Sequence, residues 1–237
     1  MRLAAAFRYD VLLQFRHGFY YAYSLVAVAY IVLMQLLPDS YLEKTNILLT
    51  FSDPSMLGFF FIGGLVLLEK GQGIHDSLFV TPYTPEEYIW SKTLSLSVLS
   101  VATSWIIHAS AFGFGTNPVW LLIGVAMTSV FFTFIGLGVA VRVKTLNGFF
   151  FLSTFATLLF MLPVLETAGI WSSPLLAVLP TYGSLLLIGA PFSAPSPAQL
   201  LYSAVLLLAW IGLAYGWTRK SVYRFLVYKI GEGAEGR

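Results

Sequence analysis

The chain has 237 residues, of which 58% are hydrophobic, 16% aromatic and only 10% charged, and its mean hydropathy is +0.81. Soluble domains carry about 25% charged residues, so this composition excludes an ordinary soluble domain and indicates a protein embedded in lipid. The net charge of +2 excludes the strongly basic surface of a nucleic-acid-binding protein, and the absence of cysteine excludes disulfides, thiol catalysis and thiolate metal sites.

Residues 2–17 are predicted to form an amphipathic helix on the membrane surface. Apolar side chains recur there at helical spacing with three arginines among them, namely Leu3, Phe7, Val11 and Phe15 with Arg2, Arg8 and Arg16. A stretch without charged residues follows, and its tyrosines gather at the N-terminal end as in an interfacial belt. This stretch predicts the first membrane span, at about 18–37.

Five further spans are predicted from the lengths of the stretches that lack Asp, Glu, Lys and Arg. A helix needs about 20 apolar residues to cross a hydrocarbon core of about 30 Å. The uncharged run from Thr93 to Val141 is too long for one span, and the turn sequence GFGTNP at 113–118 divides it. The predicted spans lie at about 54–70, 89–112, 119–141, 148–165 and 200–218. The fold predicted for 1–237 is therefore a single all-α membrane domain.

The apolar segment 167–199 contains five prolines and is predicted to form short re-entrant helices at the outer surface. The alternative is a crossing at 175–190, which would give seven spans and place the two basic termini on opposite sides. The positive-inside rule disfavours that alternative. With six spans, both termini are cytoplasmic, and Lys44 is the one basic residue outside.

Residues 69–92 form the longest polar segment on the predicted cytoplasmic side. Gly71 and Gly73 predict a helix break, IHDSLFV predicts a short helix that ends before Thr81-Pro82, and Thr84-Pro85-Glu86-Glu87 predicts a new helix start. Three acidic residues, Asp76, Glu86 and Glu87, stand where basic residues are usual. A short helix bearing Ile74, Leu78 and Phe79 needs a partner surface, or alternatively rests on lipid.

The same run resembles the signature of ABC-2 type permeases. The matching residues are Glu69, Lys70, Gly73, Leu78, Val80, Thr81, Pro82, Glu87 and Lys92. The sequence departs from that pattern at Gly71, where an acidic residue is common, and at Ile74, where threonine is common. A looser resemblance connects the chain to the fluoroquinolone-export type.

The resemblance implies the membrane subunit of an ATP-driven exporter in the plasma (inner) membrane of a bacterium or archaeon. Two permease subunits, as a homodimer, would work with two cytoplasmic ATPase subunits. Segment 71–88 would couple the two proteins through Gly73, Ile74, Asp76, Ser77, Leu78, Phe79, Val80, Thr81 and Pro82, and Glu69, Lys70, Glu87 and Lys92 would mark the span ends. The cargo implied is a small lipophilic or amphipathic compound.

The chain itself is predicted to be neither an enzyme nor a cofactor-binding protein. It contains no G-x-x-x-x-G-K-[ST] motif, so ATP and Mg²⁺ are expected on the partner ATPase. His17, His75 and His108 fall on separate segments, and no metal site is predicted from their spacing.

A polar stripe on the third predicted span is the remaining candidate site. Thr93, Ser97, Ser100, Ser104 and His108 recur at spacings of three or four residues. They could line a translocation path, or they could serve helix packing through small residues. Two other functions stay open: a proton-coupled secondary transporter that uses His108, and a non-transporting anchoring subunit that docks through 69–92.

Overall fold

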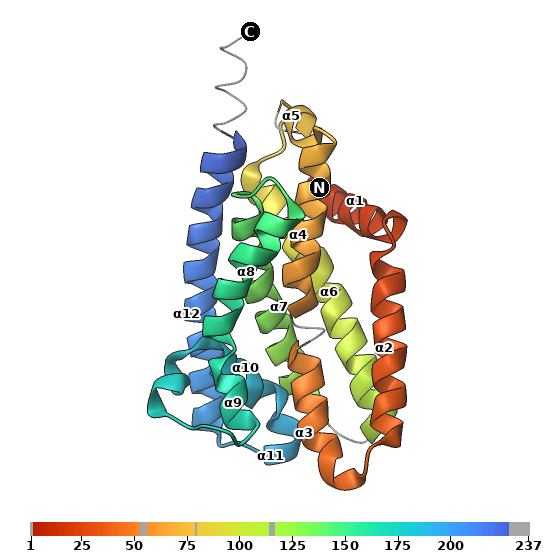
Figure 1. The fold of residues 1–237 in the computed structure, drawn as a ribbon, viewed down its shortest axis with the longest axis vertical. Helices are drawn as coiled ribbons and strands as arrows, with labels where there is room; N and C mark the ends of the chain where they lie inside the picture. The colour runs from red at the N-terminus through yellow and green to blue at the C-terminus, as the bar shows by residue number, and fades with distance from the viewer. Residues whose placement is uncertain (1, 53–55, 79, 114–116, 228–237) are drawn as a thin grey trace.

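The computed structural model describes residues 2–52, 56–78, 80–113 and 117–227, and every element in those ranges is helical (Figure 1). The elements are α1 (Arg2–Arg16), α2 (Phe19–Leu36), α3 (Asp39–Thr50), α4 (Met56–Gly71), α5 (Ile74–Leu78), α6 (Pro85–Phe112), α7 (Val119–Ala140), α8 (Leu146–Phe160), α9 (Leu162–Thr167), η2 (Pro174–Val178), α10 (Pro180–Ile188), α11 (Ala190–Ser193), α12 (Pro197–Val222) and η3 (Tyr223–Val227). The side chains of Leu57 and Asp76 are not among those that the structure describes.

Four of the described helices are long and apolar enough to cross a membrane. They are Phe19–Leu36, Pro85–Phe112, Val119–Ala140 and the continuous helix Pro197–Val227. The predicted spans at 54–70 and 148–165 correspond to α4 and α8, which have 16 and 15 residues. At about 1.5 Å per residue each is shorter than a hydrocarbon core. The all-helical membrane fold is confirmed, and the count of six spans stays a prediction.

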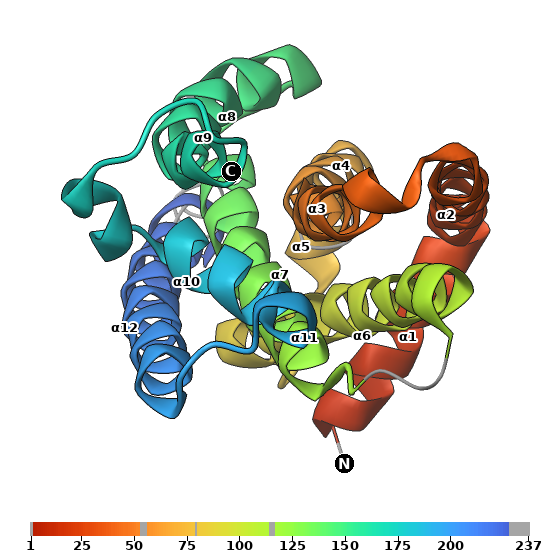
Figure 2. The ribbon, with the colours of Figure 1, turned by 90° about the horizontal axis from the view of Figure 1, so that it is seen from below.

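Helix α7 occupies the centre of the bundle and contacts α4, α6, α10 and α12 (Figure 2). Its small residues permit this arrangement. A Cβ atom added at Gly136 would lie 2.5 Å from the backbone oxygen of Phe59 in α4, and one at Gly124 would lie 2.8 Å from Leu187 in α10. The aromatic side chains of Phe59, Phe132 and Phe149 are fully buried around this centre rather than facing lipid.

Helix α1 lies across the direction of the bundle (Figure 1), and two of its polar side chains, Asp10 and Gln14, are buried, whereas its arginines are exposed. The turn to α2 is made at Gly18, whose φ of 80° favours glycine. The buried residues of α1 are Asp10, Leu13 and Gln14. Of its predicted apolar stripe, Leu3 and Phe15 are 38% and 50% exposed, as suits a helix that rests on lipid, and Phe7 and Val11 are half-buried.

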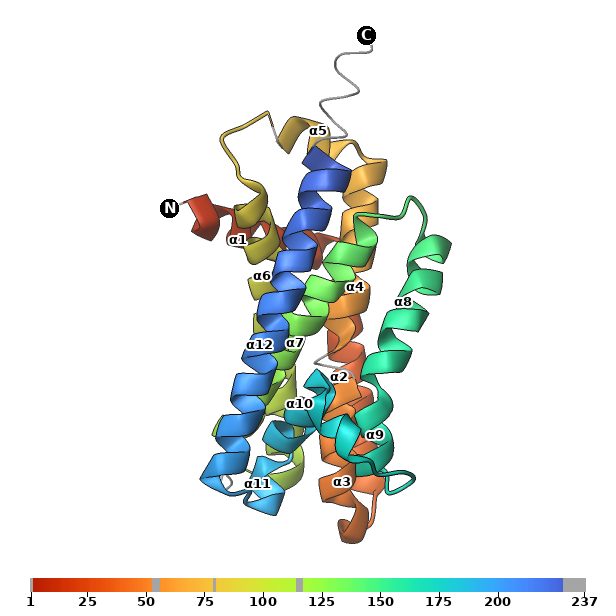
Figure 3. The same ribbon diagram turned by 90° about the vertical axis from the view of Figure 1, so that its left-hand side faces the viewer.

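Residues 39–50 form helix α3, for which we predicted no element. Asp39 stands in its first turn directly after Pro38, a pattern that favours a helix start. In Figures 1 and 3, α3 and α4 follow one another along the bundle. Asn46 and Thr50 are buried, so α3 is part of the core. The helix start predicted at Asp53-Pro54 lies outside the described residues.

The proline-rich segment 167–199 folds into η2, α10 and α11 at the end of the bundle opposite α5 (Figure 3). Each element begins at or next to a proline, which is tolerated at the first helical position. Helix α10 has nine residues, too few to cross a membrane, and is buried against α7 and α12. The chain enters and leaves this segment at the same end of the bundle.

Candidate functional site

Segment 69–92 connects α4 to α6 at the end of the bundle where α5 lies (Figure 1). Helix α4 ends at Gly71, and Gly73 makes the turn into α5 with a φ of 65°. Helix α5 spans Ile74–Leu78, and the hydroxyl of Thr81 donates to the carbonyl of Leu78, 2.6 Å away, which stabilises the exit from the helix. Phe79 and the side chain of Asp76 lie outside the described residues.

Helix α6 begins at Thr84-Pro85-Glu86-Glu87, where the sequence predicts a helix start, and the structure shows a capping box there. The Glu87 amide donates to the Thr84 hydroxyl at 3.2 Å, and the Thr84 amide donates to the Glu87 carboxylate at 2.9 Å. These bonds satisfy two backbone donors that a helix start otherwise leaves without partners. The carboxylate of Glu87 therefore orients α6 from within the chain.

Glu86 connects the start of α6 to the end of α12. Its carboxylate accepts from Arg219 Nε at 2.8 Å and from the Tyr223 hydroxyl at 3.0 Å. Glu86 and Glu87, two of the three acidic residues that stand where basic residues are usual on a cytoplasmic loop, are thus hydrogen-bonded within the chain. Their departure from that pattern is explained by structure and does not require an external partner.

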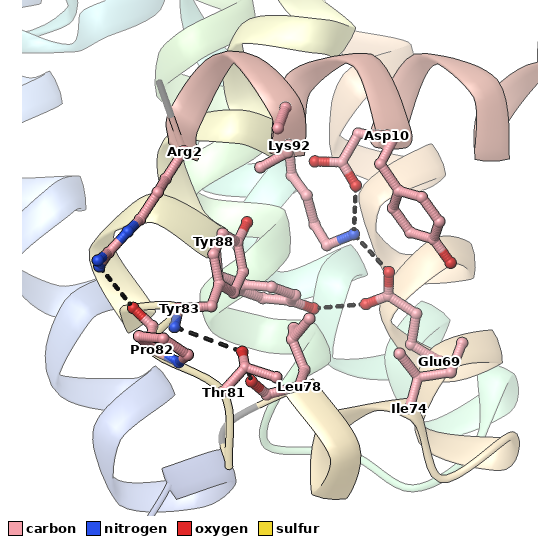
Figure 4. Close-up of a pocket in the computed structure, with 13 residues that line it drawn as sticks. Arg2, Asp10, Glu69, Ile74, Leu78, Thr81, Pro82, Tyr83, Tyr88 and Lys92 are labelled. Carbon is pink, nitrogen blue, oxygen red and sulfur yellow. Dashed lines mark hydrogen bonds and ion pairs between the residues drawn. The ribbon is translucent and has the colours of Figure 1, made fainter.

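A buried group of charges joins α1, α4 and α6 (Figure 4). Lys92 Nζ lies 3.0 Å from Asp10 Oδ1 and 2.5 Å from Glu69 Oε1. The exposed fraction is 2% for Lys92, 5% for Asp10 and 3% for Glu69. A charge so buried is stable only when it is paired and hydrogen-bonded. We refer to Asp10, Glu69 and Lys92 as the charge triad.

Further polar side chains complete the shell around the charge triad. The Tyr88 hydroxyl donates to Glu69 Oε2 at 2.7 Å, and His75 Nε2 in α5 lies 3.2 Å from the same oxygen. The Ser91 hydroxyl donates to Asp10 Oδ2 at 2.6 Å. Burial raises the pKa of the Asp10 carboxyl, although Lys92 and Ser91 act in the opposite direction. Through His75, the triad also reaches α5.

A cavity of about 430 Å³ lies beside the charge triad, between α1, α5 and the start of α6 (Figure 4). Ile74 and Leu78 of α5 line it together with Tyr9, Tyr83 and Tyr88. Burial raises the pKa of the neighbouring Tyr83 to about 12, so its hydroxyl stays protonated at neutral pH. The two apolar side chains of α5 that were predicted to need a partner protein or lipid therefore face a surface of their own chain.

The exposed part of the segment is its tip. Val80 is 81% exposed, and Ser77, Thr81 and Pro82 are exposed beside it. Arg2 of α1 donates to the carbonyl of Pro82 at 3.1 Å and holds the loop against α1. The tip is thus presented on a supported loop.

Lys70 fixes the end of α4 to the end of α7. Its ammonium donates to the carbonyls of Ala140, Val141 and Val143 at 3.0, 2.7 and 2.9 Å. These oxygens terminate α7, where the helix dipole favours a cation. The acidic-basic pair Glu69-Lys70 consequently binds in two directions, to α5 and α6 through Glu69 and to α7 through Lys70.

Replacement of Lys70 tests this assignment. We expect Lys70→Met to lower the free energy of unfolding by about 1–2 kcal/mol, because three carbonyls lose a charged donor. Thermal unfolding of the purified protein in detergent measures the effect. Lys144→Met is the matched control, because it removes an exposed ammonium from the turn after α7, and it should leave the midpoint of thermal unfolding unchanged. An equal loss of stability in both variants would contradict the role of Lys70 as a cap of α7.

The polar stripe of α6 lies inside the bundle. Ser97, Ser100, Ser104 and His108 are all buried, and Ser100 accepts from Ser129 of α7 at 3.2 Å. Within the described part of the chain, the hydroxyls of Ser97 and Ser104 have no hydrogen-bond partner. His108 lies near the end of α6 that is remote from α5, and not at the middle of the span. Its Nδ1 atom is 3.4 Å from Oδ1 of Asn46 in α3.

Comparison of the sequence with known proteins places the chain in a family. The family model described as the fluoroquinolones export permease protein family matches residues 1–230. The chain belongs to that family. The match extends from α1 through η3 and thus covers the charge triad, α5 and the tip. It confirms the resemblance found in 69–92, including its fluoroquinolone-export type.

Two curated relatives carry the same name. They are fluoroquinolones export permease proteins of Mycobacterium tuberculosis, one from strain CDC 1551 / Oshkosh and one from strain H37Rv. Each is 28% identical over 208 residues, which cover 86% of this chain and 87% of the relative. By family, the chain is a membrane permease of the export type and not an enzyme.

The sequence did not reveal one member of the site. Asp10 carries no motif signal, since it is a single acidic residue in a helix read as basic and apolar. The available clue was its place four residues before Gln14, which puts two polar groups on one face of the helix.

Proposed function

We propose that this chain is the permease subunit of an ATP-driven exporter and is coupled to a separate ATPase through segment 71–88. The single observation that carries the proposal is the exposed apolar side chain of Val80 at the tip of the loop. The charge triad, Lys70 and Arg2 join this loop to four helices, α1, α4, α6 and α7. Such a loop transmits force, because a push on it displaces α4 and α6 as a unit.

The same proposal sets the orientation and the assembly. The end that bears α5 faces the cytoplasm of a plasma (inner) membrane with both termini on that side, since α1 and the basic ends of α4, α7 and α12 gather there. In this proposal the chain has six spans and forms a homodimer. The partner ATPase binds ATP and Mg²⁺. The cargo is a lipophilic or amphipathic compound, in keeping with the name that the relatives carry.

We expect Val80→Asp to abolish ATPase docking and leave the fold intact. A carboxylate at the centre of an apolar contact weakens binding by at least about tenfold, whereas an 81% exposed site tolerates the change in the isolated chain. The experiment is to purify the tagged chain from its native membrane, quantify the ATPase subunit recovered with it, and measure ATP-dependent transport in inverted vesicles.

Leu146→Asp is the matched control, because it places the same charge on an exposed apolar residue at the start of α8, outside the segment. Recovery of the ATPase should persist in this variant. The proposal fails if no ATPase accompanies the wild type, or if Val80→Asp retains both the ATPase and transport. Transport that a protonophore stops, and that ATPase depletion leaves intact, would favour the secondary transporter using His108.

A further inference from the structure

A second groove lies on the opposite flank of the bundle, between α8 and α12. It has a volume of about 370 Å³ and apolar walls that include Leu152, Phe155 and Phe160. Helix α8 contacts α7 and α4 and stands apart from α12 (Figure 3). The groove therefore opens toward the surroundings of the bundle, with α7 as its floor.

The head of this groove lies at the depth of the lipid headgroups. Helix α12 begins at Pro197, and about 20 residues cover a hydrocarbon core of about 30 Å, so the boundary falls near Trp217. Helix α7 spans 22 residues and ends at Ala140, just before Arg142. Trp217 and Arg142, which both line the groove, are residue types that suit this interface.

Arg142 lines the head of the groove, and a second cation, Arg224, lies close enough to act on it electrostatically. The guanidinium of Arg142 stacks 4.2 Å from the Trp217 ring and donates to the Ser221 hydroxyl at 2.9 Å. The guanidiniums of Arg142 and Arg224 lie 5.6 and 5.4 Å from the same Phe225 ring. Throughout the residues that the structure describes, no carboxylate lies within ion-pair distance of either arginine.

Adjacent cations repel one another unless an anion lies between them. Guanidinium groups match phosphate oxygens especially well, since their fixed N–H groups form paired charge-assisted bonds. An anion at this depth that also carries an apolar body is an acidic lipid. A second copy of this chain would instead bring its own basic end against the first, so charge complementarity disfavours it as the occupant.

We infer that the groove between α8 and α12 binds an anionic phospholipid of the leaflet on the α5 side. Its phosphate lies between Arg142 and Arg224, and one acyl chain follows Phe155 and Phe160 along α7. This site is separate from the charge triad and does not depend on coupling to an ATPase.

Native mass spectrometry of the detergent-purified chain tests the inference with phosphatidylglycerol and phosphatidylcholine of identical acyl chains. We expect the wild type to retain at least about tenfold more phosphatidylglycerol, the ratio produced by one or two charge-assisted bonds. Arg224→Gln should reduce that ratio severalfold, and Arg142→Gln/Arg224→Gln should bring it to unity. Ala156→Phe, which fills the groove, should reduce retention of both lipids.

Arg16→Gln is the matched control, since Arg16 is an exposed arginine of α1. Helix α1 lies on the other side of the bundle from α8 and α12 (Figure 2). It should retain the wild-type ratio. Equal retention of the two lipids by the wild type, or an equal loss in Arg16→Gln, would overturn the inference. Displacement of phosphatidylglycerol by inorganic phosphate at the same concentration would overturn it as well, because it would reveal a site for a soluble anion.

Disulfide cross-linking tests whether a second copy of this chain occupies the groove instead. The chain contains no cysteine, so Phe155→Cys introduces a single thiol into the groove. Oxidation in the native membrane should leave this variant monomeric on a denaturing gel. A disulfide-linked dimer would assign the groove to a second copy of the chain and would refute lipid occupancy.

Discussion

Lys92→Met is expected to lower the free energy of unfolding by about 3–5 kcal/mol, the largest effect of any single substitution considered. The variant leaves the carboxylates of Asp10 and Glu69 buried without their cation, and a buried charge that loses its partner is strongly destabilising. Thermal unfolding in detergent measures the loss. Limited proteolysis should also show cleavage between α1 and α2, because Lys92 is the ionic link that holds α1 in place.

Two further variants separate charge from shape. Lys220→Met removes an exposed lysine from the same end of the bundle and should leave the unfolding midpoint unchanged. The combination Asp10→Asn, Glu69→Gln and Lys92→Met removes all three charges and should recover much of the lost stability, since neutral groups of similar volume need no ion pair. A Lys92→Met protein as stable as the wild type would contradict the assigned role of the charge triad.

Gly136→Leu is the second large effect that we expect. A Cβ atom at this position would lie 2.5 Å from the Phe59 backbone oxygen and 3.0 Å from the Phe59 Cα atom, so only a displacement of α4 can make room. Overpacking of this kind lowers stability by about 1–3 kcal/mol for Gly136→Ala, and the larger leucine should reach or exceed the upper value. Thermal unfolding and the yield of monodisperse protein measure the effect.

Gly212→Ala provides the comparison, because an added Cβ atom there meets nothing within 4 Å. Helix propensity alone then applies, and stability should stay constant or rise by up to about 1 kcal/mol. If Gly136→Ala behaves like Gly212→Ala, α7 and α4 are not in the close contact described.

Local signals in the sequence were sufficient where the structure depends on neighbouring residues. Thr84-Pro85-Glu86-Glu87 predicted the start of α6 because its capping partners lie within one turn, and Gly71 with Gly73 predicted the break before α5. Gly124 and Gly136 likewise allow the close approach of other helices to α7 because they carry no side chain. In each case the chemistry is decided within a few residues along the chain.

Contacts between distant residues were not accessible in this way. Nothing near Lys92 indicates that its second carboxylate comes from Asp10, and nothing near Ile74 and Leu78 indicates that α1 faces them across a cavity. Helix α3 was missed for a different reason. Its polar residues suggest an exposed loop, yet Asn46 and Thr50 are buried because α6 and α10 pack on them.

The ion pair between Asp10 and Lys92 also imposes an order on biogenesis. The two residues are separated by 82 positions, so Asp10 leaves the ribosome well before its partner exists. At about 5–20 residues per second, synthesis of the intervening chain takes roughly 4–16 seconds. During that interval the first helix has only the lipid surface to hold it. It can reach its final place only after α6, which carries Lys92, is inserted, so this docking follows the synthesis of α2, α3 and α4.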